Sequence, residues 1–98
     1  MEELGFTPLN QRVSFEGQIQ RSNKVQIPKL IRWQHKIEPD QVLKVGVSVP
    51  VKGSGEHFFL AKMRKDGRII IPKLTVAMLQ GKEENLLGYI LEITLEPA

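Results

Sequence analysis

One seven-residue word occurs twice in this chain, and its repetition constrains the fold more than any other feature. "KVQIPKL" begins at Lys24, and "RIIIPKL" begins at Arg68, 44 positions later. Sliding the chain on itself by 44 without a gap superimposes further apolar positions: Phe15 on Phe59, Ile19 on Met63, Val45 on Tyr89 and Val49 on Ile93. This correspondence predicts two similar units, residues 13–50 and 57–94.

Each unit predicts the same order of elements. "VSFEGQIQR" alternates apolar and polar residues, which is the pattern of a half-buried strand. "SN" at 22–23 and "KDG" at 65–67 are turn signals, and "KVQI" and "RIII" are the returning strands. Pro28 and Pro72 should end those strands, because proline lacks a backbone N–H and its fixed φ suits the start of a helix. The last strands are "QVLKVGVSV" and "NLLGYILEITL".

Two short helices are predicted between the prolines and the last strands, in "PKLIRWQH" and "PKLTVAMLQG". Gly81 is the expected stop of the second helix. We expect Trp33 in the core beside Leu30 rather than on the surface as a stacking platform. The predicted buried faces of the two helices are Leu30, Ile31 and Trp33, and Leu74, Ala77 and Met78.

The units are too small to bury their apolar faces separately, so they should share one core about a pseudo-twofold axis. The predicted fold is mainly β with two short helices, and its six strands are expected to form a closed barrel, which would leave no exposed edge. The 98 residues suggest one domain, residues 13–98, preceded by an arm of residues 1–12. "PVKGSGEH" reads as the connection between the units.

Composition excludes several classes of function. The chain has no cysteine, which rules out disulfides and thiol chemistry and fits a cytoplasmic protein. His35 and His57 are too few for a metal site, and no apolar run approaches the roughly 20 residues of a membrane span. The acidic start of the chain does not resemble a signal peptide. No catalytic arrangement or phosphate-binding glycine loop is recognisable, so we expect neither an enzyme nor a cofactor.

The net charge of +3 is small, but the charges are unevenly distributed. Residues 17–36 contain five cations and no acid, and residues 57–80 contain five cations and Asp66. Residues 81–98 contain four glutamates and one lysine. The basic charge therefore lies in the segments with the repeated words. Such charge is also typical of strands and turns that meet water.

The segment "SNKVQIPKLIRWQHKIEPDQVLKV" resembles the swapped-hairpin domain of AbrB, SpoVT and MazE, in which a strand ends at proline and a short helix and a Gly-Asp turn follow. The likeness covers residues 24–45 and, in the second unit, residues 62–89. The chain is also similar to the single-chain RIFT barrels of the cradle-loop group, and the sequence leaves open which of the two connectivities it has. Pro39-Asp40 replaces the Gly-Asp turn, and Glu83 and Glu84 stand there in the second unit. Arg32 matches the family's arginine four residues after proline, where the second unit has Val76.

The resemblance implies a DNA-binding transcriptional regulator that recognises double-stranded DNA through basic hairpins. The two units differ, so equal recognition of a symmetric operator by both halves is not expected. One chain contains both halves, so a monomer should suffice, without a membrane partner. The alternatives are a barrel that binds a nucleotide or flavin-like molecule and a protein-interaction module.

The resemblance carries the DNA-binding role to basic residues that lie in or beside the repeated words. A two-stranded ribbon can enter the major groove, where lysine and arginine contact phosphates or guanine. Arg32 has an alternative structural role, in which it pairs with Asp40 or another acid. The candidate residues are Arg21, Lys24, Lys29 and Arg32 in the first unit and Arg64, Lys65, Arg68 and Lys73 in the second.

Overall fold

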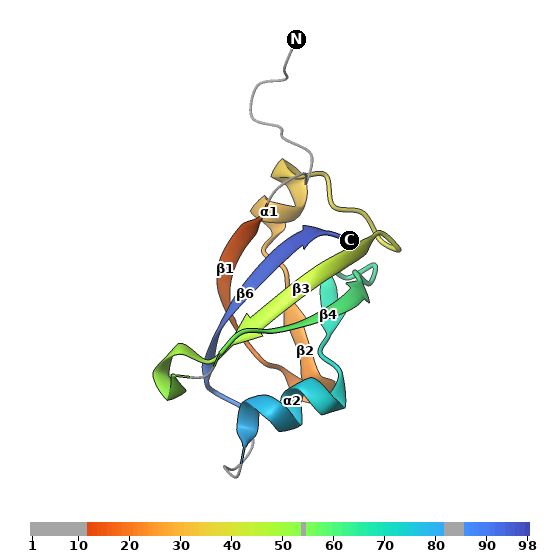
Figure 1. The fold of residues 1–98 in the computed structure, drawn as a ribbon. Coiled ribbons are helices and arrows are strands. Elements are labelled where there is room, and N and C mark those ends of the chain that lie inside the picture. Colours follow the sequence, from red (N-terminus) through yellow and green to blue (C-terminus); the bar gives the residue numbers. More distant parts are fainter. Residues whose placement is uncertain (1–11, 54, 82–85) are drawn as a thin grey trace.

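The computed structural model describes residues 12–53, 55–81 and 86–98 (Figure 1). The prediction of a mainly β fold with two short helices is confirmed. The strands and helices are β1 (Val13–Gln18), β2 (Lys24–Gln26), α1 (Lys29–Gln34), β3 (Val42–Ser48), β4 (His57–Lys62), β5 (Arg68–Ile70), α2 (Lys73–Gln80) and β6 (Ile90–Pro97). Two single turns of 3-10 helix, Arg21–Asn23 and Pro50–Lys52, precede β2 and follow β3. Neither described helix is long and apolar enough to span a membrane.

The strands form two open antiparallel sheets, so the predicted closed barrel is wrong. One sheet has four strands in the order β1-β6-β3-β4, and the other is a ribbon of β2 and β5 alone. The ribbon strands have three residues each, because a turn precedes each of them and a proline follows two residues after its end. They are too short to continue a ladder onto β1 and β4, and a single bridge, Gln20 to Lys24, joins the first hairpin at its turn.

The spacing of the two units changes along the chain. The bounds of β1 and β4, and those of β2 and β5, differ by 44 residues, and the two helices also start 44 residues apart. In the last strands the spacing is 48, because Phe15 pairs with Ile93 whereas Phe59 pairs with Val45. The gapless match of Val45 with Tyr89 is therefore wrong. The second unit has four more residues between the start of its helix and its last strand, and two of them lengthen α2.

The core lies between the four-stranded sheet and the ribbon. The buried apolar side chains of the described residues form one cluster, to which both the sheet and the ribbon contribute. Val25 and Ile69, which pair with each other at the centre of the ribbon, are fully buried, as are Val45 and Ile93 in the sheet. The outer faces of the ribbon and the sheet therefore point away from each other.

The helices bury faces that differ from the predicted ones. In α2, Thr75, Val76 and Leu79 are buried, whereas Leu74 is 73% and Met78 53% exposed. The α2 sequence has apolar residues on two stripes, so helical periodicity alone could not identify the buried one.

In α1, Leu30 is 60% and Trp33 55% exposed, so the prediction that Trp33 lies in the core is wrong. Ile31 is half-buried against the core. A helix of six residues has less than two turns, so it offers only a narrow strip of side chains to the core.

Gly81 and Asp40 both occupy turns with a positive φ. Gly81 caps α2 with a positive φ of 62°, which confirms the predicted helix stop. Asp40 has a φ of 72°, and its N–H donates to the Met63 carbonyl at 3.2 Å, which ties the turn before β3 to the other unit. Glu83 and Glu84 lie outside the described residues.

Candidate nucleic-acid interface

The ribbon places cations from both units on one surface. Val25 and Ile69 point into the core, so the residues on either side of them point outward: Lys24 opposite Ile70, and Gln26 opposite Arg68. Lys24 and Arg68 are then diagonal neighbours on the outer face, at a typical separation of about 7–8 Å. We call this surface, with the turns and helix starts at its two ends, the basic ribbon.

One end of the basic ribbon combines the first turn with the second helix. The N–H of Ile71 donates to the Asn23 carbonyl at 2.8 Å, and α2 begins two residues after Ile71. Arg21 and Lys73 are exposed and belong to this end. A cleft of about 250 Å³ lies between the turn and α2, and its walls include Arg21, Val76 and Leu87.

The other end is built in the same way with the two units exchanged. The N–H of Ile27 donates to the Gly67 carbonyl at 2.9 Å, which is the counterpart of the contact between Ile71 and Asn23. The exposed residues Arg64 and Lys65 lie in the turn before Gly67, and the exposed Lys29 begins α1 two residues after Ile27.

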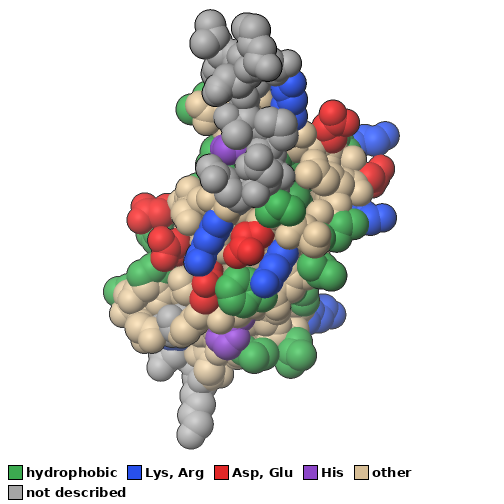
Figure 2. All heavy atoms as spheres, turned by 45° about the horizontal axis from the view of Figure 1, so that its top comes forward, with side chains coloured by type: hydrophobic (Ala, Val, Ile, Leu, Met, Phe, Trp, Pro, Cys, Tyr) green, Lys and Arg blue, Asp and Glu red, His purple; other side chains and the backbone are tan. Residues whose placement is uncertain are grey.

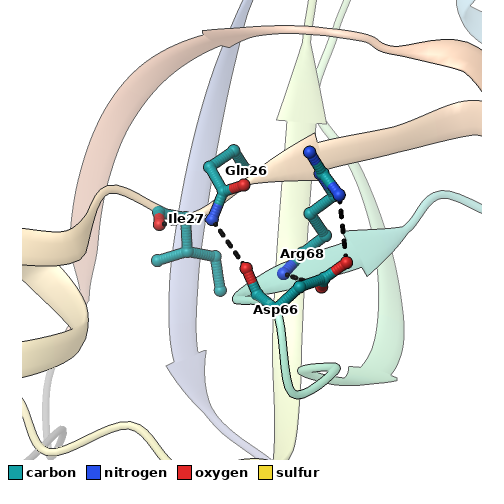
Figure 3. Close-up of polar contacts among 4 residues, drawn as sticks. All are labelled: Gln26, Ile27, Asp66 and Arg68. Carbon is teal, nitrogen blue, oxygen red and sulfur yellow. Dashed lines mark hydrogen bonds and ion pairs between the residues drawn. The ribbon is translucent and has the colours of Figure 1, made fainter.

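Arg68 is held by an acid of its own turn (Figure 3). Its Nη1 lies 3.0 Å from Asp66 Oδ2, and its backbone N–H donates to Asp66 Oδ1 at 3.0 Å. The backbone hydrogen bond is the main cause that lowers the pKa of Asp66 below its usual value of 3.8. The ionised Asp66 carboxylate stabilises the folded chain fully above pH 3.8, and this stabilisation is lost as the pH falls through the lowered pKa of Asp66. Asp66 is thus ionised near neutral pH and offsets part of the charge of Arg68.

If the basic ribbon binds duplex DNA, Asp66→Asn is expected to tighten that binding about fivefold to tenfold at moderate salt, because it frees Arg68 for roughly one further phosphate contact. The asparagine oxygen can still accept the N–H of Arg68, so the turn should persist. Fluorescence anisotropy with a labelled duplex measures the change. Glu92→Gln, on the outer face of the four-stranded sheet, removes the same charge and should change affinity less than about twofold. Equal effects of the two variants would contradict the location of the site.

Arg32 lies apart from the exposed cations. Its Nε donates to the Ile27 carbonyl at 3.1 Å, and its guanidinium extends over Gly67 of the other unit. Gln26 Nε2 reaches the same turn and donates to the Asp66 carbonyl at 3.1 Å (Figure 3). These contacts give Arg32 a part in holding α1 against the second turn through the backbone, and the ion pairs found among the described residues do not join it to Asp40 or another acid.

Several acidic side chains lie on the outer face of the four-stranded sheet, away from the ribbon. Glu16 and Glu92 are cross-strand partners on the outer face of the four-stranded sheet, where Glu96 lies opposite Lys44 in the strand register. Glu56 accepts hydrogen bonds from Arg12 and from the Thr94 hydroxyl over the same sheet. Figure 2 shows a face on which acidic, basic and hydrophobic side chains are mixed.

The sequence predicted the cations but missed the exposed apolar residues beside them. Trp33 and Leu30 line a shallow depression of about 480 Å³ together with Lys29. The spacing of Lys29 and Trp33, four residues apart, places both on one side of a helix and could have indicated this group.

Comparison with known proteins supports the fold. No family model and no curated protein matches the sequence. The structure is similar to the solution structure of PHS018 from Pyrococcus horikoshii, with a TM-score of 0.72 and 23% identity over 86% of this chain and 88% of that chain. At this level of identity the likeness shows that the two proteins share a fold.

Proposed function

We propose that the protein binds double-stranded DNA through the basic ribbon, in the manner of AbrB-like transcriptional regulators. The observation that carries the proposal is the gathering of cations from both units along the ribbon. The outer face of the four-stranded sheet instead mixes acids with cations, because Glu16 and Glu92 lie there together with Lys44 and Lys62. A polyanion would be attracted more strongly to the ribbon than to the sheet.

The size of the site follows from the contacts of its cations. Two of the eight predicted residues, Arg32 and Arg68, are engaged by the protein itself. The other six remain for phosphates: Arg21, Lys24, Lys29, Arg64, Lys65 and Lys73. Six phosphate contacts correspond to a slope of about −5 for log affinity against log salt.

The proposal includes an internal duplication, which explains why the site has two similar ends. It is supported by the pairing of Val25 with Ile69, residues 44 positions apart, at the centre of the ribbon. It is also supported by the matching contacts from Ile71 to Asn23 and from Ile27 to Gly67. The ends differ in detail, so the two halves of a DNA site need not have the same sequence.

A salt series with a labelled random duplex tests the proposal. Fluorescence anisotropy should detect binding at low salt, and log affinity should fall steeply with log salt, with a slope of about −5. A specific site can then be sought by selection from a random pool. Absence of binding near roughly 50 mM salt, where phosphate contacts are strong, would overturn the proposal.

A further inference from the structure

Trp33 is the only tryptophan of the chain, and more than half of its side chain is exposed on α1. Leu30, which is 60% exposed, lies beside it, and the depression that they line has about 480 Å³ of space. Trp33 is a large aromatic residue that does not belong to the buried core cluster. Such a ring is suited to stacking against another planar group.

One cation lines this apolar patch, and another follows it closely in the sequence. Lys29 is part of its wall, and Lys36 is exposed three residues after Trp33. The start of α1 is also tied to the turn that contains Arg64 and Lys65, through the hydrogen bond from Ile27 to Gly67. The patch is therefore continuous with one end of the basic ribbon.

At the opposite end of the ribbon, the position that corresponds to Trp33 has no aromatic residue. The helices start 44 residues apart, so the position of Trp33 in α1 corresponds to Ala77 in α2. Leu74 and Met78 are exposed on α2, but neither has a planar face. The two ends thus carry similar cations, and one of them adds an aromatic ring.

We infer that the α1 end of the basic ribbon binds single-stranded nucleic acid, with an unpaired base stacked on Trp33 and the adjoining phosphates on Lys29 and the Arg64–Lys65 turn. The inference rests on the proposed function, since the phosphates would follow the same ribbon. A base in a duplex is already stacked on both faces, whereas a single strand presents its bases freely. Proteins that bind single strands combine aromatic platforms with a basic track in this way.

A protein partner fits the patch less well. Among the described residues, Leu30 and Trp33 form the apolar part of the depression, and Lys29 in its wall also belongs to the basic ribbon. An extended polyanion can follow such a track, and its bases supply the planar groups that the ring can contact.

The fluorescence of Trp33 tests the inference directly, because the chain has no other tryptophan. The native protein is titrated with an unlabelled oligothymidine of about 12 nucleotides, a length within the range of single-strand sites. We expect strong quenching on binding. A duplex of the same length should quench the fluorescence much less.

Substitutions then separate stacking from charge. Trp33→Ala should weaken binding of the single strand roughly 5- to 150-fold, which corresponds to the loss of one stacked base, and should leave duplex binding unchanged. Trp33→Phe should restore part of the affinity. Met78→Ala, which shortens a similarly exposed side chain on α2, is the matched control and should have no effect.

The outcomes distinguish this inference from the proposed function. If the duplex binds but the single strand neither quenches Trp33 nor loses affinity in Trp33→Ala, the inference is overturned and the proposed function stands. If the single strand binds with quenching and the duplex does not bind, the inference holds and the proposed function fails. If neither the single strand nor the duplex binds, the inference and the proposed function are both overturned.

Discussion

A variant in which Arg21, Lys24, Arg64 and Lys65 are all replaced by glutamine is expected to lose affinity for duplex DNA by a factor on the order of a thousand near 0.1 M salt. Four of the six available phosphate contacts would disappear, and the slope of log affinity against log salt should fall from about −5 to about −2. All four side chains are exposed or half-buried, so the melting temperature should hardly change. Anisotropy across a salt series and thermal melting measure the two quantities.

The matched control changes the net charge by the same amount on the other side of the core. Replacing Lys44 and Lys62 by glutamate also lowers the charge by four units, and both lysines lie on the outer face of the four-stranded sheet. This control should weaken binding less than about tenfold, through long-range repulsion alone. A loss as large as that of the ribbon variant would mean that net charge, and not the ribbon, governs binding.

The second large effect is expected in the four-stranded sheet, where Gly46→Ala should destabilise the fold by about 2 kcal/mol. A Cβ at Gly46 would lie 2.5 Å from Thr94 Oγ1, 2.7 Å from Glu56 Oε2 and 2.8 Å from the ring of Phe58. Glu56 would have to move and give up the hydrogen bond that it accepts from the Thr94 hydroxyl at 2.9 Å. Thr94 is only 2% exposed, so its hydroxyl would lose its partner without gaining water.

Gly17→Ala is the matched control for this prediction. Gly17 also lies in a strand, but a Cβ there would meet Ile93 Cδ1 at 3.4 Å, which is an ordinary contact. Alanine at this position should be neutral or stabilise the fold by up to about 1 kcal/mol, because it reduces the freedom of the unfolded chain. Thermal melting of both variants gives the comparison. Similar melting temperatures would contradict the close packing around Gly46.

The local elements were predictable because they depend on short-range chemistry. Pro28 and Pro72 end the ribbon strands and precede the helices, as their missing N–H and fixed φ require. Barrel closure was a different kind of expectation, since it depends on how far each strand continues beside its neighbour. The three-residue length of β2 and β5 limits that pairing, and neither the composition nor the periodicity of the sequence revealed that these strands are so short.

The errors in the helices and the last strand have a common cause: both depend on which part of the same chain packs against the element. Whether Leu74 or Val76 faces inward depends on where the sheet lies relative to α2, since both are apolar. The last strand was misaligned because Val45 was matched to Tyr89. Both residues favour strands, so the sequence is compatible with a spacing of 44 or of 48 residues. The cross-strand pairs decide for Ile93, because Phe15 pairs with Ile93 as Phe59 pairs with Val45.

The exposed cations of the candidate site were predictable from the repeated words, but their partners were not. The hydrogen bonds between Asp66 and Arg68 join residues two positions apart in one turn, so they are a local effect. The reach of Arg32 over Gly67 joins residues 35 positions apart and needs the assembled fold. The exposure of Trp33 likewise depends on how α1 is seated.

The crosswise hydrogen bonds at the two ends of the ribbon bear on how the protein unfolds. Each turn is fastened by a strand end of the opposite half, through Ile71 on Asn23 and Ile27 on Gly67. Neither half can then detach while the other keeps its ribbon strand paired. The chain should therefore melt as a single cooperative unit, even though its sequence contains two similar units.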